Sequence, residues 1–219
     1  MHFGEEHNLF QKAVRRLVQE EINPHVDEWE EREEIPRELF RRMGELGFLG
    51  VEFSQEYGGA NADLWMSIVL AEELARCRSG GVAFSIIVHT DMSSPWLARL
   101  GNDEQKARFL AAIIRGEKIC ALAITEPEAG SDMAALSTRA RRDGDQWVIS
   151  GSKTFITNGV YGDLYFVAAR TRESGPRHGR LSQFLVERGS GGLSISKKLS
   201  KTGMWASDTA ELVFDDVKV

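Results

Sequence analysis

Leu122-Ala-Ile-Thr-Glu-Pro-Glu-Ala-Gly-Ser-Asp132 and Gly151-Ser-Lys-Thr-Phe-Ile-Thr-Asn-Gly159 are the two stretches that decide how this chain is organised. Residues 119–124 are apolar and have the length of a buried strand, which the Thr-Glu-Pro that follows would end. The small residues after it predict a tight loop, in which Gly130 permits a backbone conformation or a close approach that a side chain would block. Consecutive backbone N–H groups in such a loop can hold an anion. Composition alone favours the simpler interpretation, a β-turn followed by a β-hairpin.

Upstream of these stretches, apolar residues recur at helical spacing with charged residues between them. The pattern predicts helices over residues 5–30, with a kink or end at Pro24, and over 36–46, 63–75, 82–99 and 104–115. Gly80-Gly81 is expected to break the helical pattern between the third and fourth of these helices.

Downstream, the period changes from that of a helix to that of a strand. Strands are predicted over 138–142, 147–150, 164–169, 184–186, 193–195 and 210–214, with a hairpin turn at Asp143-Gly144-Asp145. A run of helices followed by a run of strands indicates an α+β chain. We expect an α-helical N-terminal domain, residues 1–118, and a small antiparallel β-barrel or sandwich domain, residues 119–219.

Composition restricts the class of protein. The 219 residues are 42% hydrophobic and carry a net charge of −6, which describes a globular chain and argues against nucleic acid as a partner. Cys77 and Cys120 form neither a metal-binding spacing nor a disulfide framework. No apolar run has the length of a membrane span, and the acidic start has no signal-peptide pattern. These features favour a cytoplasmic protein, and a processed mitochondrial form is compatible with them.

The order and spacing of Thr-Glu-Pro-x-Ala-Gly-Ser-Asp and Gly-Ser-Lys-x-Phe-Ile-Thr-Asn-Gly resemble the acyl-CoA dehydrogenases. Residues 199–219 look like the closing strands of the family's middle domain, and the helical start is compatible with its N-terminal domain. The resemblance implies an FAD enzyme of fatty acid β-oxidation that oxidises an acyl-CoA thioester to an enoyl-CoA. It also implies a homo-oligomer that passes electrons to an electron-transferring flavoprotein.

The resemblance assigns site residues one position at a time. The implied flavin-binding residues are Leu122, Ile124, Thr125, Gly130, Ser131, Phe155, Ile156 and Thr157. Thr157 would point at the N5 edge of the flavin, and Ser131 would also meet the CoA thioester. Two positions depart from the family pattern. Many relatives have Trp where this chain has Phe155, and a smaller residue is common where it has Glu128.

The segment 170–180 is rich in arginine and is expected to form a mobile loop between strands. Composition favours a solvated connection. The alternative is a landing site for CoA phosphates, with Arg177 and Arg180 as the binding residues, because arginine pairs well with phosphate. Lys197, Lys198 and Lys201 are a weaker candidate of the same kind.

His89 and Asp91 lie in an almost fully apolar segment, which the resemblance places in the acyl-chain wall. The simpler interpretation of the histidine is a hydrogen-bonded core residue.

The resemblance further implies a helical C-terminal domain that supplies the carboxylate base. No residue of this chain matches that base, and Glu126 belongs to the cofactor turn. We therefore expect the chain alone to fold at best partly, bind FAD weakly and not dehydrogenate acyl-CoA. The alternatives are an acyl-CoA oxidase or flavin monooxygenase on the same fold, or a non-enzymatic fragment or subunit-interaction module.

Overall fold

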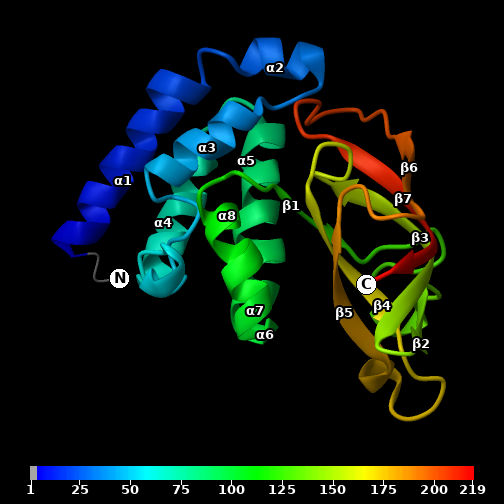
Figure 1. The fold of residues 1–219 in the computed structure, drawn as a ribbon. Coiled ribbons are helices and arrows are strands. Elements are labelled where there is room, and N and C mark those ends of the chain that lie inside the picture. The colour runs from blue at the N-terminus through cyan, green and yellow to red at the C-terminus, as the bar shows by residue number, and fades with distance from the viewer. Residues whose placement is uncertain (1–3) are drawn as a thin grey trace. The chain divides into compact units, whose positions relative to one another are not determined.

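The computed structural model describes residues 4–219, which fold as two compact units. The first unit contains the chain through Lys118 and the later segment Lys201–Ser207. The second contains Ile119–Ser200 and Asp208–Val219. Figure 1 shows helices in the first unit and a curled sheet in the second, so the expected α+β fold class is confirmed.

The first unit is built from short helices. They are α1 (Glu5–Leu17), α2 (Val26–Arg32), α3 (Arg37–Glu45), α4 (Leu64–Leu74), α5 (Gly80–Ile87), α6 (Ser94–Leu100), α7 (Asp103–Gln105) and α8 (Ala111–Ile114). Local sequence explains where several begin. The Asp63 carboxylate accepts a hydrogen bond from the backbone N–H of Met66, and Asn102 and Gln105 cap each other's backbone N–H groups.

The kink or end expected at Pro24 is confirmed, and one other helix prediction needs correction. The helix expected over 5–30 passes into a π-helical segment at Val18–Ile22 and ends before α2 begins. Gly80-Gly81 does not break a helix: it opens α5, and Ser79 caps that helix by accepting a hydrogen bond from the Val82 N–H. A Cβ on Gly81 would lie 2.9 Å from the Met204 carbonyl oxygen, so this glycine permits close packing of the Lys201–Ser207 segment.

The second unit is a seven-stranded sheet. Its strands are β1 (Cys120–Ala123), β2 (Arg139–Asp143), β3 (Gln146–Thr157), β4 (Leu164–Arg170), β5 (Leu181–Glu187), β6 (Leu193–Lys198) and β7 (Thr209–Lys218). The order is β1-β4-β2-β3-β7-β6, and β5 pairs with β4.

The sheet is mixed, and in this respect the expected antiparallel pairing was wrong. β1 runs parallel to β4, and β2 meets the far end of the same edge of β4 through Arg139 and Arg170. The remaining pairs are antiparallel. Parallel neighbours need a long connection, and here β2 and β3 themselves provide the chain between β1 and β4. Local hydrophobic periodicity carries no information about this pairing.

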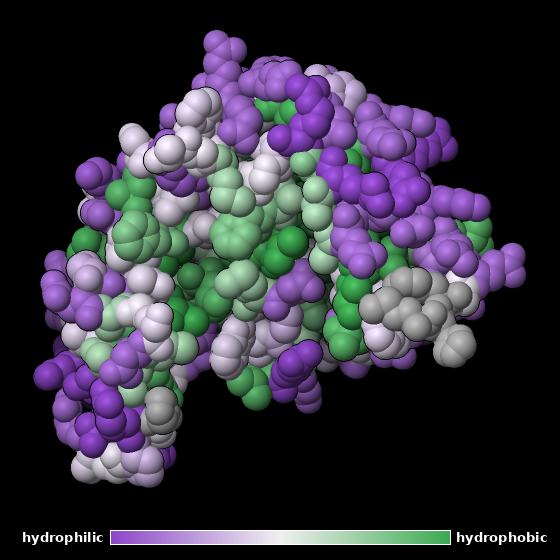
Figure 2. Space-filling model, turned by 180° about the vertical axis from the view of Figure 1, so that it is seen from behind, coloured by the Kyte–Doolittle hydropathy of each residue, from purple (hydrophilic) through white to green (hydrophobic). Residues whose placement is uncertain are grey.

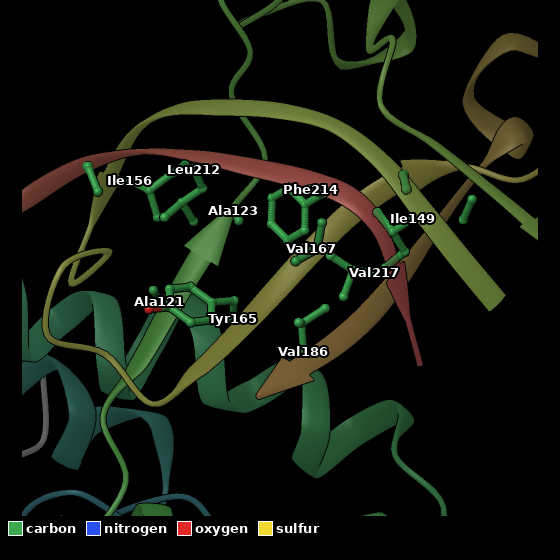
Figure 3. Packing of buried hydrophobic residues seen from close by; sticks show 13 residues of the cluster. Ala121, Ala123, Ile149, Ile156, Tyr165, Val167, Val186, Leu212, Phe214 and Val217 are labelled. Carbon is green, nitrogen blue, oxygen red and sulfur yellow. The ribbon is translucent and has the colours of Figure 1, made fainter. Parts of the chain in front are cut away.

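The interior of the curled sheet holds the hydrophobic core of the second unit (Figure 3). Its buried residues are Ala121, Ala123, Ala140, Ile149, Ile156, Tyr165, Val167, Ala169, Val186, Ala210, Leu212, Phe214 and Val217. The Tyr165 hydroxyl donates to the carbonyl oxygens of Gly159 and Gly162, and burial raises its pKa to about 12. Strands β1 to β5 and β7 therefore pack on one core.

The face shown in Figure 2 carries both hydrophilic and hydrophobic residues. The exposed large apolar side chains include Phe155, which is 68% exposed, and Leu100, Leu64 and Leu9. Among the described residues, no helix is long and apolar enough to cross a membrane.

Candidate functional site

The two sequence stretches meet in space within the second unit. The backbone N–H of Thr154 in β3 donates to the carbonyl oxygen of Thr125 at 2.8 Å, just beyond the end of β1. The Lys153 ammonium donates to the Ile124 carbonyl oxygen, also at 2.8 Å. The end of β1 and the middle of β3 are therefore joined by two direct contacts.

A buried ion pair lies directly behind this junction. Lys153 Nζ is 2.8 Å from Glu126 Oε1, and the two side chains are only 0% and 2% exposed. The Glu126 carboxylate also accepts hydrogen bonds from the backbone N–H groups of Ser137 and Thr138 and from the Ser137 hydroxyl. Burial would raise the Glu126 pKa, but the hydrogen bonds from Lys153, Thr138 and Ser137 outweigh it and lower the pKa to about 2. Glu126 is therefore a carboxylate at neutral pH.

The loop after β1 is a tight turn. Glu126 and Ala129 exchange backbone hydrogen bonds, and Ala129 is buried while Gly130 and Ser131 are exposed. Gly130 does not have the positive φ that would require glycine, and a Cβ there would meet only the Thr125 Cγ2, at 3.9 Å. The protein itself does not require glycine at this position. The space beside the Gly130 backbone is open, and a ligand that approaches the backbone closely needs such space.

Phe155 has a backbone conformation that is unusual for its residue type. Its φ is +58°, a region that bulky residues rarely adopt, and the register of β3 against β7 shifts between Lys153 and Ile156. The bulge turns the Phe155 ring outward, 68% exposed, whereas Thr154 and Ile156 on either side are buried. Strained conformations of this kind cluster at functional sites, so the exposed ring is a candidate ligand contact.

The other predicted flavin contacts differ in what they can offer. Thr125 and Thr157 are partly exposed, and both hydroxyls can exchange hydrogen bonds with a ligand. Ile156 points into the hydrophobic core, which leaves only its backbone for such a contact. Leu122 alternates with the core residues of β1 and lies on the opposite face of that strand.

The arginine-rich segment 170–180, called the basic loop from here on, reaches the Gly130-Ser131 turn through one arginine. Arg177 Nη2 donates to Asp132 Oδ2 at 2.9 Å, and both side chains are more than half exposed. Arg180 instead donates to the Gly175 carbonyl oxygen within its own loop. Of these two arginines, Arg177 is the one that contacts the residue beside Gly130-Ser131.

The three lysines of the weaker candidate divide between the two units. Lys201 belongs to the first unit, where its ammonium donates to the Met204 carbonyl oxygen and to the carbonyl and hydroxyl oxygens of Ser207. Lys197 and Lys198 end β6 in the second unit, and Lys198 lies 5.6 Å from the centre of the Tyr161 ring.

His89 and Asp91 have separate surroundings in the first unit. The His89 ring is fully buried, lies 3.3 Å from the Ile113 carbonyl oxygen and packs edge-on against Phe40, so the prediction of a core histidine is confirmed. Asp91 lines a cavity of about 460 Å³ together with Glu52 and Arg99. Burial raises the Asp91 pKa. Among the side chains that the structure describes, no group of three His, Cys, Asp or Glu residues could hold a metal ion.

Lys153 is the residue of this region that sequence reasoning missed. A lysine within a polar strand segment is ordinarily solvated, so its type and position gave no reason to expect full burial. The one available signal was Glu126, an acidic residue at the end of an apolar strand, which needs a cation or several donors if it is buried.

Comparisons with known proteins agree with this architecture. The family model for the acyl-CoA dehydrogenase N-terminal domain matches residues 4–117, and the model for the middle domain matches residues 121–217. The chain belongs to the acyl-CoA dehydrogenase family.

Individual relatives give the extent of the likeness. The mitochondrial long-chain specific acyl-CoA dehydrogenase of Sus scrofa is 42% identical over 99% of this chain and 50% of its own length. The crystal structure of an acyl-CoA dehydrogenase from Geobacillus kaustophilus has a TM-score of 0.93 at 44% identity, covering 100% of this chain and 57% of that one. The structure of a Bacillus anthracis acyl-CoA dehydrogenase complexed with FAD has a TM-score of 0.89 at 32% identity. The match covers 99% of this chain and 36% of that one. This chain spans about half the length of the curated relatives it matches.

Proposed function

We propose that the second unit binds FAD and that the protein containing these residues oxidises an acyl-CoA thioester to the enoyl-CoA. One observation carries the proposal. The two motif stretches meet beside β1 and present Thr125, Ser131, Phe155 and Thr157 at or near the surface, next to a turn with open space at Gly130. The family membership of the chain and the FAD complex of a structural neighbour support it.

The groups at or near the surface are of the chemical types that a flavin would contact. The Thr125 and Thr157 hydroxyls can donate or accept hydrogen bonds at its polar edge, and the Phe155 ring offers a flat apolar surface. When bound, FAD would supply the chemistry of accepting the β hydride of the acyl chain. A hydroxyl donor directed at N5, the role proposed for Thr157, would stabilise the reduced ring.

Arg177 is the candidate CoA contact that the geometry favours over Arg180. It reaches Asp132, the residue after Ser131, whereas Arg180 is bonded within its own loop. We assign both Ser131 and Arg177 to contacts with the CoA thioester substrate.

Removal of the α proton needs a carboxylate close to the substrate and shielded from water. No residue of this chain is assigned that role. Transfer of electrons to an electron-transferring flavoprotein, assembly as a homo-oligomer and a cytoplasmic or mitochondrial location are parts of the same proposal, supported by the family alone.

The test is an anaerobic titration of the purified chain with FAD, then with acyl-CoAs of several chain lengths, followed by absorption spectroscopy. A perturbed flavin spectrum that saturates with FAD supports the flavin site. An unchanged spectrum of free FAD contradicts it. In a separate aerobic assay, oxygen uptake with an acyl-CoA, instead of reduction of an electron carrier, would favour an acyl-CoA oxidase on the same fold.

A further inference from the structure

We propose that the buried Glu126–Lys153 pair is the positioning device for the candidate flavin site: it holds the Thr125 turn and the Phe155 bulge in register with each other. The flavin part of this inference rests on the proposed function, whereas its structural part does not. Neither residue is assigned to touch the cofactor.

The pair joins three segments that are distant in sequence. Lys153 in β3 holds the Ile124 carbonyl oxygen at the end of β1, and Glu126 holds the backbone N–H groups of Ser137 and Thr138 just before β2. Because Lys153 and Glu126 also bond each other at 2.8 Å, the end of β1, the start of β2 and the middle of β3 are tied at one point.

The neighbours of the pair are the residues that would meet the flavin. Thr125 precedes Glu126 in the chain, and Phe155 follows Lys153 by two positions, inside the bulge. The Thr154 N–H is bonded to the Thr125 carbonyl oxygen between them. A shift of either charged side chain would therefore displace Thr125 relative to Phe155.

Burial makes the arrangement sensitive to the loss of one partner. Removing either charge leaves the other buried and unpaired, and it also releases backbone groups that have no water to bond. A hydrophobic pair could fill the same space but would not bond these carbonyl and N–H groups. The ion pair thus specifies where the turn lies, beyond filling the interior.

The experiment measures amide hydrogen exchange and FAD binding in Glu126→Gln and Lys153→Met. We expect exchange at residues 124–138 and 153–157 to rise by at least about tenfold, with protection retained in β4, and the Kd for FAD to rise by a similar factor. The control is Asp145→Asn, which removes one negative charge from an exposed position in the hairpin between β2 and β3, outside the turn, and should change neither quantity.

Unchanged exchange at 124–138 and 153–157, or an equal rise in β4, would overturn the inference, because the pair would then be dispensable or merely part of overall stability. If either single variant fails to fold, the double variant, which leaves no unpaired charge, is measured against the same criteria. If the wild-type chain does not bind FAD, the proposed function fails and the exchange measurement alone decides this inference.

Discussion

Arg177 and Asp132 form a 2.9 Å ion pair that links the basic loop to the Gly130-Ser131 turn. Both side chains are exposed, so the pair itself adds little stability. Its effect is to hold a guanidinium beside the turn, where Asp132 competes with any phosphate for that guanidinium.

This competition gives a prediction for CoA binding. The Arg177→Ala/Arg180→Ala variant should weaken CoA-thioester binding, with a greater loss at low salt than at high salt, because screening reduces the attraction between exposed charges. Asp132→Asn should leave binding unchanged or tighten it, since it frees Arg177. Calorimetry at two ionic strengths makes the comparison. Arg16→Ala/Arg32→Ala, which removes two exposed arginines of the first unit, is the control for net charge. A loss independent of salt, or none, would favour the solvated-loop interpretation.

Thr157→Val tests the proposed N5 contact. Valine keeps the β-branched shape of threonine but deletes the hydroxyl, so the strand should remain intact. We expect FAD binding to weaken by about 1 kcal/mol, the size of one neutral hydrogen bond, or the flavin spectrum to change. Thr202→Val, at an exposed threonine of the first unit, should have no effect. Identical FAD affinity and spectrum in Thr157→Val and the wild type would exclude Thr157 from the site.

Phe155 gives a prediction for stability. At its φ of +58°, glycine is free of the strain that a side chain imposes. Phe155→Gly should therefore be more stable than Phe155→Ala by about 1 kcal/mol, the reverse of the usual order within a strand. Both variants should bind FAD more weakly than the wild type, because each removes the exposed ring. Thermal unfolding compares the two. Greater stability of the alanine variant would show that the backbone at this position is not strained.

Acid should selectively weaken the second unit through Glu126. Its pKa is about 2 in the folded protein and 4.5 for the free group, so the folded state favours the ionised form. This contribution, on the order of 3 kcal/mol, is present above pH 4.5 and is lost as the pH falls towards 2. In Glu126→Gln the same acid range should reduce stability by less. The free energy of unfolding of the wild type and of Glu126→Gln is measured between about pH 5 and pH 2.5. Equal dependence on pH in the two proteins would contradict the lowered pKa of Glu126.

Much of the site could be predicted from sequence because its residues are contiguous. The Thr-Glu-Pro end of the first strand was placed correctly, since an apolar run and the polar residues that end it are local signals. The strand predicted over 147–150 continues to Thr157 in β3, so the prediction missed its second half. The helix start at Asp63 followed from a capping preference that acts within one turn. The role of Gly130 did not follow in the same way, because its φ and its free space depend on the folded backbone.

The sequence by itself determined the family, the change from helices to strands near Lys118, and the residues that form the two motif stretches. Only the tertiary structure decided the parallel pairing of β1 with β4, the burial of Lys153 and the outward turn of Phe155. The physical reason is the range of the interactions. Secondary structure and capping are set by neighbours along the chain, whereas the burial of a side chain is set by contacts with distant segments. Lys153 is buried because Glu126 and the end of β1 reach it across the sheet, and no local pattern records that contact.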